Sequence, residues 1–173
     1  MKVLCSHAVD IRAPAEQVFE RVCDLDRWPT WFGCVVSASQ PQARSLGPGE
    51  EIHVCMHAGR RRWREDLEVT RFITNAFLSF EALYSVARRI DFRFERRGQV
   101  TRLACSMGYP IYGGIVPAVL DALLGRRRVK KGLRDSLVHL KNIVEEQTGS
   151  TQVIDDLDAL AVAPIARPAA QAS

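Results

Sequence analysis

The chain has 173 residues, of which 47% are hydrophobic and 25% are charged, and its formal net charge is +4. This length is typical of one domain, and this composition is typical of a globular protein in water. No apolar run approaches the roughly 20 residues that cross a bilayer, and the first residues lack the apolar core of a signal peptide. The mild positive charge does not by itself indicate a nucleic-acid-binding protein.

The cysteines are odd in number and widely separated, and no two of them form a CxxC pair. They are Cys5, Cys23, Cys34, Cys55 and Cys105. This pattern fits reduced thiols better than a disulfide framework. We therefore expect a cytoplasmic protein.

A strand and two short helices are predicted first in the chain. Alternating apolar and polar residues predict a strand that ends near Arg12. Pro14 suits the first position of a helix, because proline lacks the N–H that would be unpaired there, and helical spacing then continues to Asp24. Asp26 can cap a second short helix. That helix carries Trp28, Trp31 and Phe32. So much aromatic surface needs a core, a ligand or a partner to cover it.

Six strands joined by short turns are predicted next. Their expected ranges are 35–43, 51–58, 63–73, 77–85, 88–95 and 100–109. Glycine, proline and asparagine mark the turns between them, most clearly at 46–49. Consecutive strands with short turns predict an antiparallel meander, not a parallel sheet with helical crossovers.

The apolar period becomes helical from about residue 115 and continues to Glu146. Gly125 and Gly132 are candidate interruptions of this helix, since a glycine costs about 1 kcal/mol in a helix interior. Beyond the helix the chain is rich in alanine and proline. We therefore predict a domain of residues 1–147 and a disordered tail of residues 148–173.

The order of elements is β-α-α-β6-α. A twisted antiparallel sheet has one face to bury, and the apolar stripe of the last helix can cover it. The sequence thus predicts an α+β fold in which a curved antiparallel sheet wraps around a long C-terminal helix, with an internal cavity between them.

Short motifs at both ends of the chain agree with this arrangement. They are Ala13-Pro14, Val18, Asp26, Trp28-Pro29 and Phe32, then Leu137, Leu140, Lys141, Val144 and Glu145. In these motifs, and in element order over residues 3 to 147, the chain resembles the START-related SRPBCC superfamily of helix-grip proteins, in particular its polyketide cyclase/dehydrase branch. The resemblance implies a cavity for a hydrophobic ligand. In aromatase/cyclases, a carrier-bound poly-β-ketone undergoes aldol closure and dehydration there.

Strand alternation indicates which polar side chains face the cavity. Glu65 lies between Trp63 and Leu67, where desolvation would raise the pKa of its carboxyl group and suit it to acid/base chemistry. The alternative is that Glu65 lies near the end of the sheet and pairs with an arginine. His7 fits a histidine of the core or rim better than a base. Tyr84 and Tyr109 fit packing residues whose hydroxyl groups reach the mouth of the cavity.

The resemblance extends these expectations to a full site. In that family an inward arginine commonly occupies the position of Val69 here, and Arg71 is the next inward basic residue in the predicted register. The candidate catalytic residues are therefore Glu65, Tyr84, Tyr109 and Arg71. The expected ligand-binding residues are Trp28, Trp31, Phe32, Trp63, Leu67, Val69, Phe80 and Met107. The aromatic segment from Trp28 to Phe32 either gates the cavity, as the matching segment does in aromatase/cyclases, or packs in the core.

No metal or other cofactor is expected. His53 and His57 are close in sequence, but on a strand they lie about 13 Å apart at about 3.3 Å per residue, which is too far to share one ion. No nucleophile elbow, P-loop or dinucleotide-binding fingerprint is present.

A basic run precedes the last part of the predicted helix. Its cations are Arg126, Arg127, Arg128, Lys130, Lys131 and Arg134. The run is either a solvated helix face or a docking surface for an acidic partner, such as an acyl carrier protein or an anionic membrane surface. We do not expect nucleic acid, because no aromatic stacking platform accompanies the charge.

Three functions are compatible with this sequence. An aromatase/cyclase-type enzyme predicts a polar patch deep in the cavity. A carrier of lipids or other hydrophobic metabolites predicts a nearly apolar cavity. A non-enzymatic partner protein predicts that the aromatic residues form a surface patch.

Overall fold

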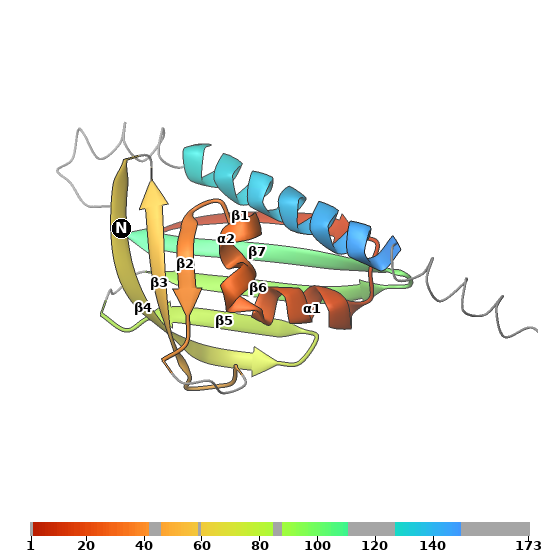
Figure 1. Ribbon diagram of the computed structural model, residues 1–173, viewed down its shortest axis with the longest axis horizontal. Coiled ribbons are helices and arrows are strands. Elements are labelled where there is room, and N and C mark those ends of the chain that lie inside the picture. The colour runs from red at the N-terminus through yellow and green to blue at the C-terminus, as the bar shows by residue number, and fades with distance from the viewer. Residues whose placement is uncertain (1, 42–45, 59, 85–87, 111–126, 150–173) are drawn as a thin grey trace, which may run out of the picture.

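A curved antiparallel sheet lies against a long C-terminal helix in the computed structural model, which describes residues 2–41, 46–58, 60–84, 88–110 and 127–149 (Figure 1). In chain order the elements are β1 (Lys2–Ile11), α1 (Ala15–Cys23), the 3-10 turn η1 (Leu25–Arg27), α2 (Trp28–Trp31), β2 (Val35–Ser39), β3 (Glu51–Ala58), β4 (Arg61–Ile73), β5 (Phe77–Ala82), β6 (Arg89–Arg97) and β7 (Val100–Pro110). The C-terminal helix covers residues 127–149. This order confirms the predicted β-α-α-β6-α arrangement and the α+β class.

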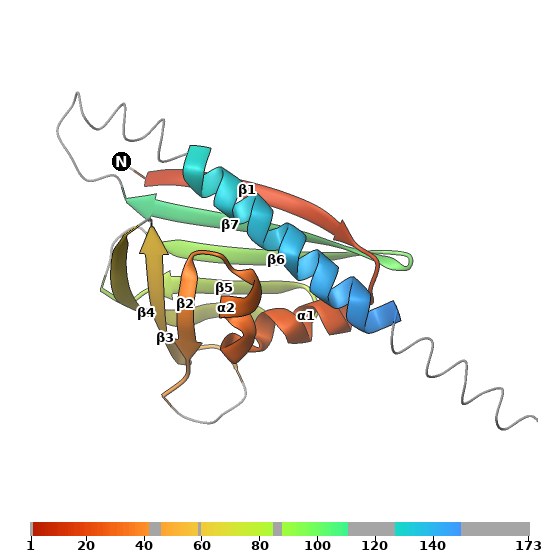
Figure 2. The same cartoon turned by 45° about the horizontal axis from the view of Figure 1, so that its top comes forward.

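The seven strands follow the order β1-β7-β6-β5-β4-β3-β2 across the sheet. Strands β2 to β7 are each paired with their neighbours in sequence. Short connections join the strands from β3 to β7, and a longer one, residues 40–50, joins β2 to β3. Strand β1 lies at the far edge and pairs with β7. The segment α1-η1-α2 connects the two edges. Figure 2 shows this segment and the C-terminal helix on the same, concave side of the sheet.

The C-terminal helix buries one apolar stripe against the sheet. The stripe consists of Leu133, Leu137, Leu140 and Val144. The spacing of these residues repeats every three or four positions, so they all fall on one side of the helix. Burial of each such side chain contributes about 1.5–3 kcal/mol. Polar contacts fix the helix at its C-terminal half, where Lys141 Nζ donates to the carbonyl of Asp10 at 2.7 Å.

The C-terminal helix continues two residues past the domain boundary expected from the sequence. Thr148 is part of the helix, and its hydroxyl donates to Gln17 Oε1 at 2.7 Å and also contacts the carbonyl of Val144 at 2.9 Å. Gly132 lies inside the helix without ending it. The expected helix start near residue 115, Gly125 and the predicted tail from residue 150 onward lie outside the described residues.

Two strands end several residues earlier than the sequence predicts, and the ends of β4, β6 and β7 differ from the prediction by one or two residues. Strand β2 ends at Ser39 and β5 ends at Ala82. No described helix is both long enough and apolar enough to span a bilayer.

Candidate functional site

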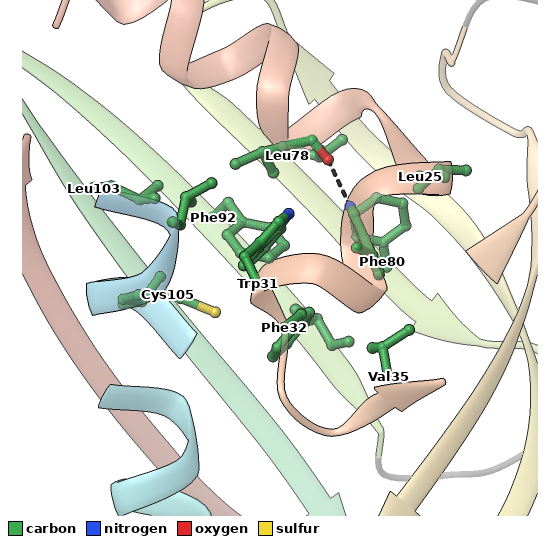
Figure 3. Close-up of a cluster of buried hydrophobic side chains, with 14 of the residues drawn as sticks. Leu25, Trp31, Phe32, Val35, Leu78, Phe80, Phe92, Leu103 and Cys105 are labelled. Atoms are coloured by element: carbon green, nitrogen blue, oxygen red, sulfur yellow. Dashed lines mark hydrogen bonds between the residues drawn. The ribbon is translucent and has the colours of Figure 1, made fainter. Parts of the chain in front are cut away.

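An aromatic cluster fills the space between α2 and the sheet. Trp28 is 0% exposed, and its ring centroid lies 5.3 Å from that of Phe80 and 6.2 Å from that of Phe92. Trp31 stacks on Phe32 with ring centroids 5.0 Å apart. Figure 3 shows Trp31, Phe32, Phe80 and Phe92 gathered in this one cluster. The segment from Trp28 to Phe32 is therefore part of the core in this structure, and these residues do not form the surface patch that the partner-protein alternative requires.

The two indole N–H groups of the cluster have different environments. Trp28 Nε1 donates to the carbonyl of Val22 at 2.7 Å. Trp31 Nε1 is buried and has no hydrogen-bond partner within the described part of the chain. An unpaired buried donor costs about 1–3 kcal/mol. Trp31 therefore holds one N–H group that an oxygen atom of a bound molecule could satisfy.

A second, polar feature lies on the same concave face, nearer the end of the sheet where β4 begins. Glu65 and Arg88 form an ion pair whose side chains are only 8% and 20% exposed. The guanidinium carbon of Arg88 lies 5.1 Å from the centroid of the Trp63 ring. Trp63 Nε1 is buried and has no hydrogen-bond partner among the described residues. The N–H donors of Arg88 and Trp63 and the carboxylate of Glu65 thus lie in one region that is mostly shielded from solvent.

Local strand geometry places these three side chains. Along β4, Trp63, Glu65, Leu67 and Val69 point toward the core, whereas Arg62 and Arg64 are exposed. This alternation is the period of two expected for a strand. Arg88 lies two positions before Ile90, which is buried, and it therefore shares the inward direction. Glu65 thus makes the ion pair with an arginine that the sequence left open as the alternative to an isolated carboxylate.

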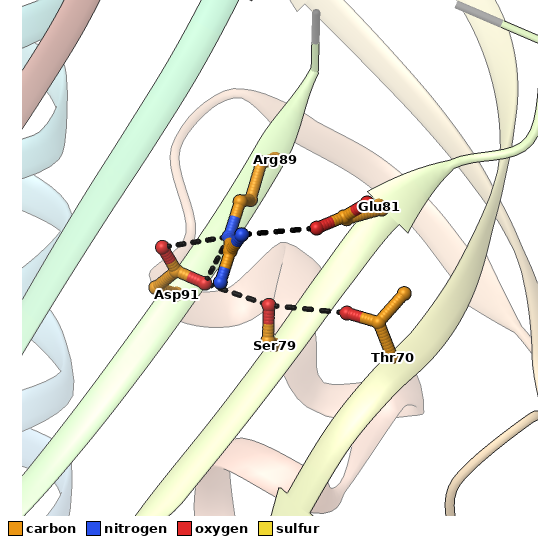
Figure 4. Close-up of polar contacts among 5 residues, drawn as sticks. All are labelled: Thr70, Ser79, Glu81, Arg89 and Asp91. Carbon is orange, nitrogen blue, oxygen red and sulfur yellow. Dashed lines mark hydrogen bonds and ion pairs between the residues drawn. The ribbon is translucent and has the colours of Figure 1, made fainter.

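Arg89, the next residue, points to the opposite face of the sheet. There it contacts Asp91 at 2.8 Å and Glu81 at 3.0 Å. Ser79 is fully buried and donates to Asp91 at 2.6 Å, and Thr70 donates to Ser79 at 3.3 Å (Figure 4). The hydrogen bond that Arg89 donates to Asp91 raises the pKa of the Arg89 guanidinium. This network of hydrogen bonds and ion pairs links β4, β5 and β6. It lies on the face of the sheet opposite the concave site.

Four of the expected ligand-binding residues line the buried concave face as the alternation predicts. They are Leu67, Val69, Phe80 and Met107, of which Met107 is the most exposed at 8%. The site also contains Trp63, which is half-buried.

The candidate catalytic residues are not all brought together. Tyr84 is 86% exposed and points to solvent, not to the mouth of a cavity. Arg71 is also exposed, and its guanidinium carbon lies over the Phe77 ring, 4.9 Å from the centroid. The reason is a register shift between Val69 and Arg71, which reverses the direction of the residues after it. The side chain of Tyr109 lies outside the described residues.

Arg88 is the residue that the sequence analysis missed. Its signal was available, because it extends the inward series Ile90, Phe92 and Phe94 by one step. That series does not indicate that Glu65, on the other side of β5, is the partner of Arg88. Glu65 and Arg88 are 23 residues apart and belong to segments that do not pair with each other in the sheet.

The partly buried thiols of Cys23 and Cys34, together with His7, do not add a reactive group to the site. Burial raises the pKa of the Cys34 thiol to about 11 and that of Cys23 to about 12, with Glu20 also raising the latter. These thiols stay protonated at neutral pH and are poor nucleophiles. Burial also lowers the pKa of His7, and the nearby charges of Arg134 and Lys130 lower it further.

No three side chains of His, Cys, Asp or Glu in the described part of the chain are grouped so that they could hold a metal ion. His53 instead contacts Asp66 at 2.6 Å on the outer face of the sheet. A surface groove of about 250 Å³ lies between α1 and the C-terminal helix. It is lined by Gln17, Glu20, Arg21, Asp24, Val144 and Gln147 and contains none of the predicted site residues.

Comparisons with known proteins agree on one fold. A protein from Thermus thermophilus has a TM-score of 0.66 at 19% identity, and the match covers 82% of this chain and 97% of that one. A START superfamily protein from Mycobacterium smegmatis has a TM-score of 0.57 at 16% identity, covering 86% of this chain and 98% of that one. At these identities the likeness shows a shared fold.

The di-domain ARO/CYC BexL from the BE-7585A biosynthetic pathway has a TM-score of 0.61 at 20% identity. The match covers 83% of this chain but 46% of BexL, so the chain corresponds to about half of that protein. Among curated proteins, none matches this chain in sequence. A family model described as polyketide cyclase/dehydrase and lipid transport matches residues 3–145. The chain therefore belongs to the polyketide cyclase/dehydrase and lipid transport family, and it shares the fold of a START superfamily protein.

Proposed function

We propose that this protein binds a hydrophobic intermediate that carries several carbonyl groups and promotes its aldol cyclisation and dehydration. The observation that carries the proposal is the Glu65–Arg88 ion pair on the concave face, beside Trp63. Membership of the cyclase/dehydrase family and the likeness of fold to BexL support it.

Aldol closure needs a base for an α-proton and a donor that polarises the attacked carbonyl group. An arginine side chain has five N–H donors, so Arg88 can keep Glu65 and still donate to a ketone oxygen. Glu65 takes the α-proton, the resulting enolate carbon bonds to the polarised carbonyl carbon, and the new alkoxide takes that proton to become a hydroxyl group. In the dehydration, Glu65 takes a second α-proton and returns it to the departing hydroxyl group, which leaves as water.

The surroundings of the pair suit this chemistry. Both side chains are mostly buried, and hydrogen bonds to charged groups are stronger where water is excluded. The Trp63 ring holds the guanidinium group in place by a cation–π contact, which contributes about 0.5–1 kcal/mol or more when the pair is desolvated. Trp31 Nε1, which has no partner in the described part of the chain, is a further donor for a carbonyl oxygen of the bound molecule.

The test is a cyclisation assay with a thioester of a linear poly-β-ketone, with products separated by chromatography and identified by mass spectrometry. We expect the protein to accelerate formation of one aromatic product over the spontaneous mixture. Arg88→Gln should lower that rate about 10²- to 10³-fold, as is typical for loss of one stabilising donor. Glu65→Gln should lower it by a similar factor, because the base is lost.

Arg89→Gln is the matched control, because Arg89 is the adjacent arginine, is also ion-paired and faces the other side of the sheet. Breaking one half of a buried pair can cost about 3–5 kcal/mol of stability, so each variant must be shown to fold. The double variant Glu65→Gln/Arg88→Gln leaves no unpaired buried charge at this position and should fold but remain inactive. Equal activity of the Arg88→Gln and Arg89→Gln variants would overturn the proposal.

A second candidate is a non-enzymatic carrier of lipids or hydrophobic metabolites. The observation in its favour is the apolar character of the buried concave face. Apart from the Glu65–Arg88 pair and Thr101, whose hydroxyl donates to the carbonyl of Ala13, the described sheet residues buried on this face are apolar or aromatic. Native mass spectrometry of the protein purified from its own host separates the two candidates. A phospholipid, isoprenoid or fatty acid bound unchanged supports the carrier, whereas an aromatic polyketide-like product supports the cyclase.

A further inference from the structure

Cations from two distant parts of the sequence gather at one end of the molecule. The turn between β3 and β4 and the start of the described C-terminal helix lie at this same end in both views (Figures 1 and 2). We call these cations the basic rim, which consists of Arg60, Arg61, Arg62, Arg127, Arg128, Lys130, Lys131 and Arg134. All of them are exposed. The cations of the C-terminal helix therefore lie at the same end as the arginines near the turn between β3 and β4, which are far from them in sequence.

The cations of the basic rim are not neutralised by ion pairs within the described part of the chain. None of its cations makes an ion pair with a residue in the described ranges. At the opposite end of the sheet the cations are neutralised: Arg96 pairs with Glu16 at 3.3 Å, and Arg97 pairs with Glu95 at 2.9 Å. Unpaired like charges repel one another, so their gathering favours an anionic partner from outside the chain.

The positive charges of the helix also affect the pKa of a residue in β1. Arg134 and Lys130 both lower the pKa of His7, a residue of β1, although burial lowers it more. This agrees with a positive field at this end of the molecule. Lys130 and Arg134 lie close enough to β1 to act on His7. Arg128 and Lys131 lie on the side of the helix away from the buried Leu133 and Leu137, where they face solvent.

The kind of partner follows from the shape and composition of this end. The cations are spread along an arc that joins a turn to a helix, and the surface groove lies elsewhere, between α1 and the last turns of the C-terminal helix. Tyr84, at 86% exposure, follows the end of β5, where Ala82 pairs with Leu67 at the middle of β4. A broad arc of exposed lysines and arginines matches the extended anionic surface of a bilayer, which attracts clustered cations.

We propose that the basic rim docks the protein on the surface of an anionic phospholipid bilayer. Each lysine or arginine near such a surface strengthens binding about fivefold, and the attraction decays over roughly 10 Å at 0.1 M salt. Docking by this end sets the beginning of β4, with Trp63 and Glu65, toward the lipid. The proposal goes beyond the proposed function and does not depend on it.

The test is co-sedimentation of the full chain with vesicles of phosphatidylcholine alone and with vesicles that also contain phosphatidylglycerol. We expect binding only to the anionic vesicles, with loss of binding as salt is raised. Arg61→Gln/Arg62→Gln and Arg127→Gln/Lys131→Gln should each weaken it about 25-fold, since each removes two cations. Combining the two double variants should abolish it.

The matched control is Arg96→Gln/Arg97→Gln, which removes the same charge at the opposite end and should leave vesicle binding within about twofold, because these arginines are too far away to contribute. Equal weakening by the control would show that net charge, not the basic rim, drives binding, and would overturn the proposal. So would binding to an acidic acyl carrier protein without binding to anionic vesicles. Cyclisation measured without vesicles should be unchanged in the rim variants, which separates this test from that of the proposed function.

Discussion

Cys34 illustrates how the environment of a single residue decides its chemistry. It follows α2, next to the aromatic cluster, and burial raises the pKa of its thiol from 9.0 to about 11. The thiolate, not the thiol, is the reactive form. A cysteine that looks like a free nucleophile in the sequence is therefore inert in the folded protein.

We expect alkylation by iodoacetamide at neutral pH to be about 100-fold slower at Cys34 than at an unperturbed thiol, because raising the pKa from 9.0 to about 11 lowers the thiolate fraction by that factor. Mass-spectrometric mapping of alkylation over time gives the rate at each cysteine. The same peptide measured in denaturant is the control, since unfolding should restore ordinary reactivity. Rapid alkylation of Cys34 in the native protein would contradict the raised pKa of its thiol.

At the scale of elements, α2 depends on its neighbours. It has four residues, too few to form a stable helix alone. The aromatic contacts of Trp28 and Trp31 hold one side of it. The turn after it is held by the C-terminal helix, where the Gly33 N–H donates to Ser136 Oγ at 3.0 Å and the Ser136 hydroxyl donates to the carbonyl of Gly132 at 2.7 Å.

We expect Ser136→Ala to lower the free energy of unfolding by about 0.5–1 kcal/mol, since one hydrogen bond of about 1 kcal/mol is lost and alanine favours the helix slightly more than serine. The amide of Gly33 should exchange its hydrogen faster, which nuclear magnetic resonance can follow. Ser37→Ala is the control, because Ser37 is exposed on β2. Unchanged exchange at Gly33 would mean that this contact does not hold the turn.

At the scale of the whole molecule, charge on the C-terminal helix affects the stability of the edge strand β1. Burial, together with Arg134 and Lys130, lowers the pKa of His7 in the folded state below its ordinary value of 6.5. A protonated His7 is therefore less favourable in the folded than in the unfolded chain. This part of the stability is fully present above pH 6.5 and is lost as the pH falls through 6.5 toward the lower value of the folded protein.

We expect the free energy of unfolding, measured with urea over a pH series, to decrease less steeply below pH 6.5 in His7→Asn than in the parent protein. The effect is small, because His7 is only half-buried and solvent screens the charges. His139→Asn is the matched control, because His139 is an exposed histidine of the C-terminal helix. If both variants have the pH dependence of the parent, the charges of the helix do not reach β1.

The sequence was sufficient for the order of elements because a strand and a helix have different apolar periods. The alternation from Trp63 to Val69 also indicated the correct face of β4. It could not indicate the register shift before Arg71, because no glycine or proline marks that position and only pairing with β5 defines it. The Glu65–Arg88 pair was hidden for a similar reason, since β5 separates the two segments that supply it.

The placement of β1 has a consequence for the order of folding. From β2 to β7 every strand can pair with its neighbour in sequence as soon as the single connection between them closes. Strand β1 has no such partner nearby, because Ile11 pairs with Thr101 and Lys2 with Pro110. Closing so long a loop costs entropy before any contact is gained, and contacts between distant residues slow folding. We therefore expect the meander to assemble first, with β1 joining it last and leaving the β7 edge open to pairing with another chain until then.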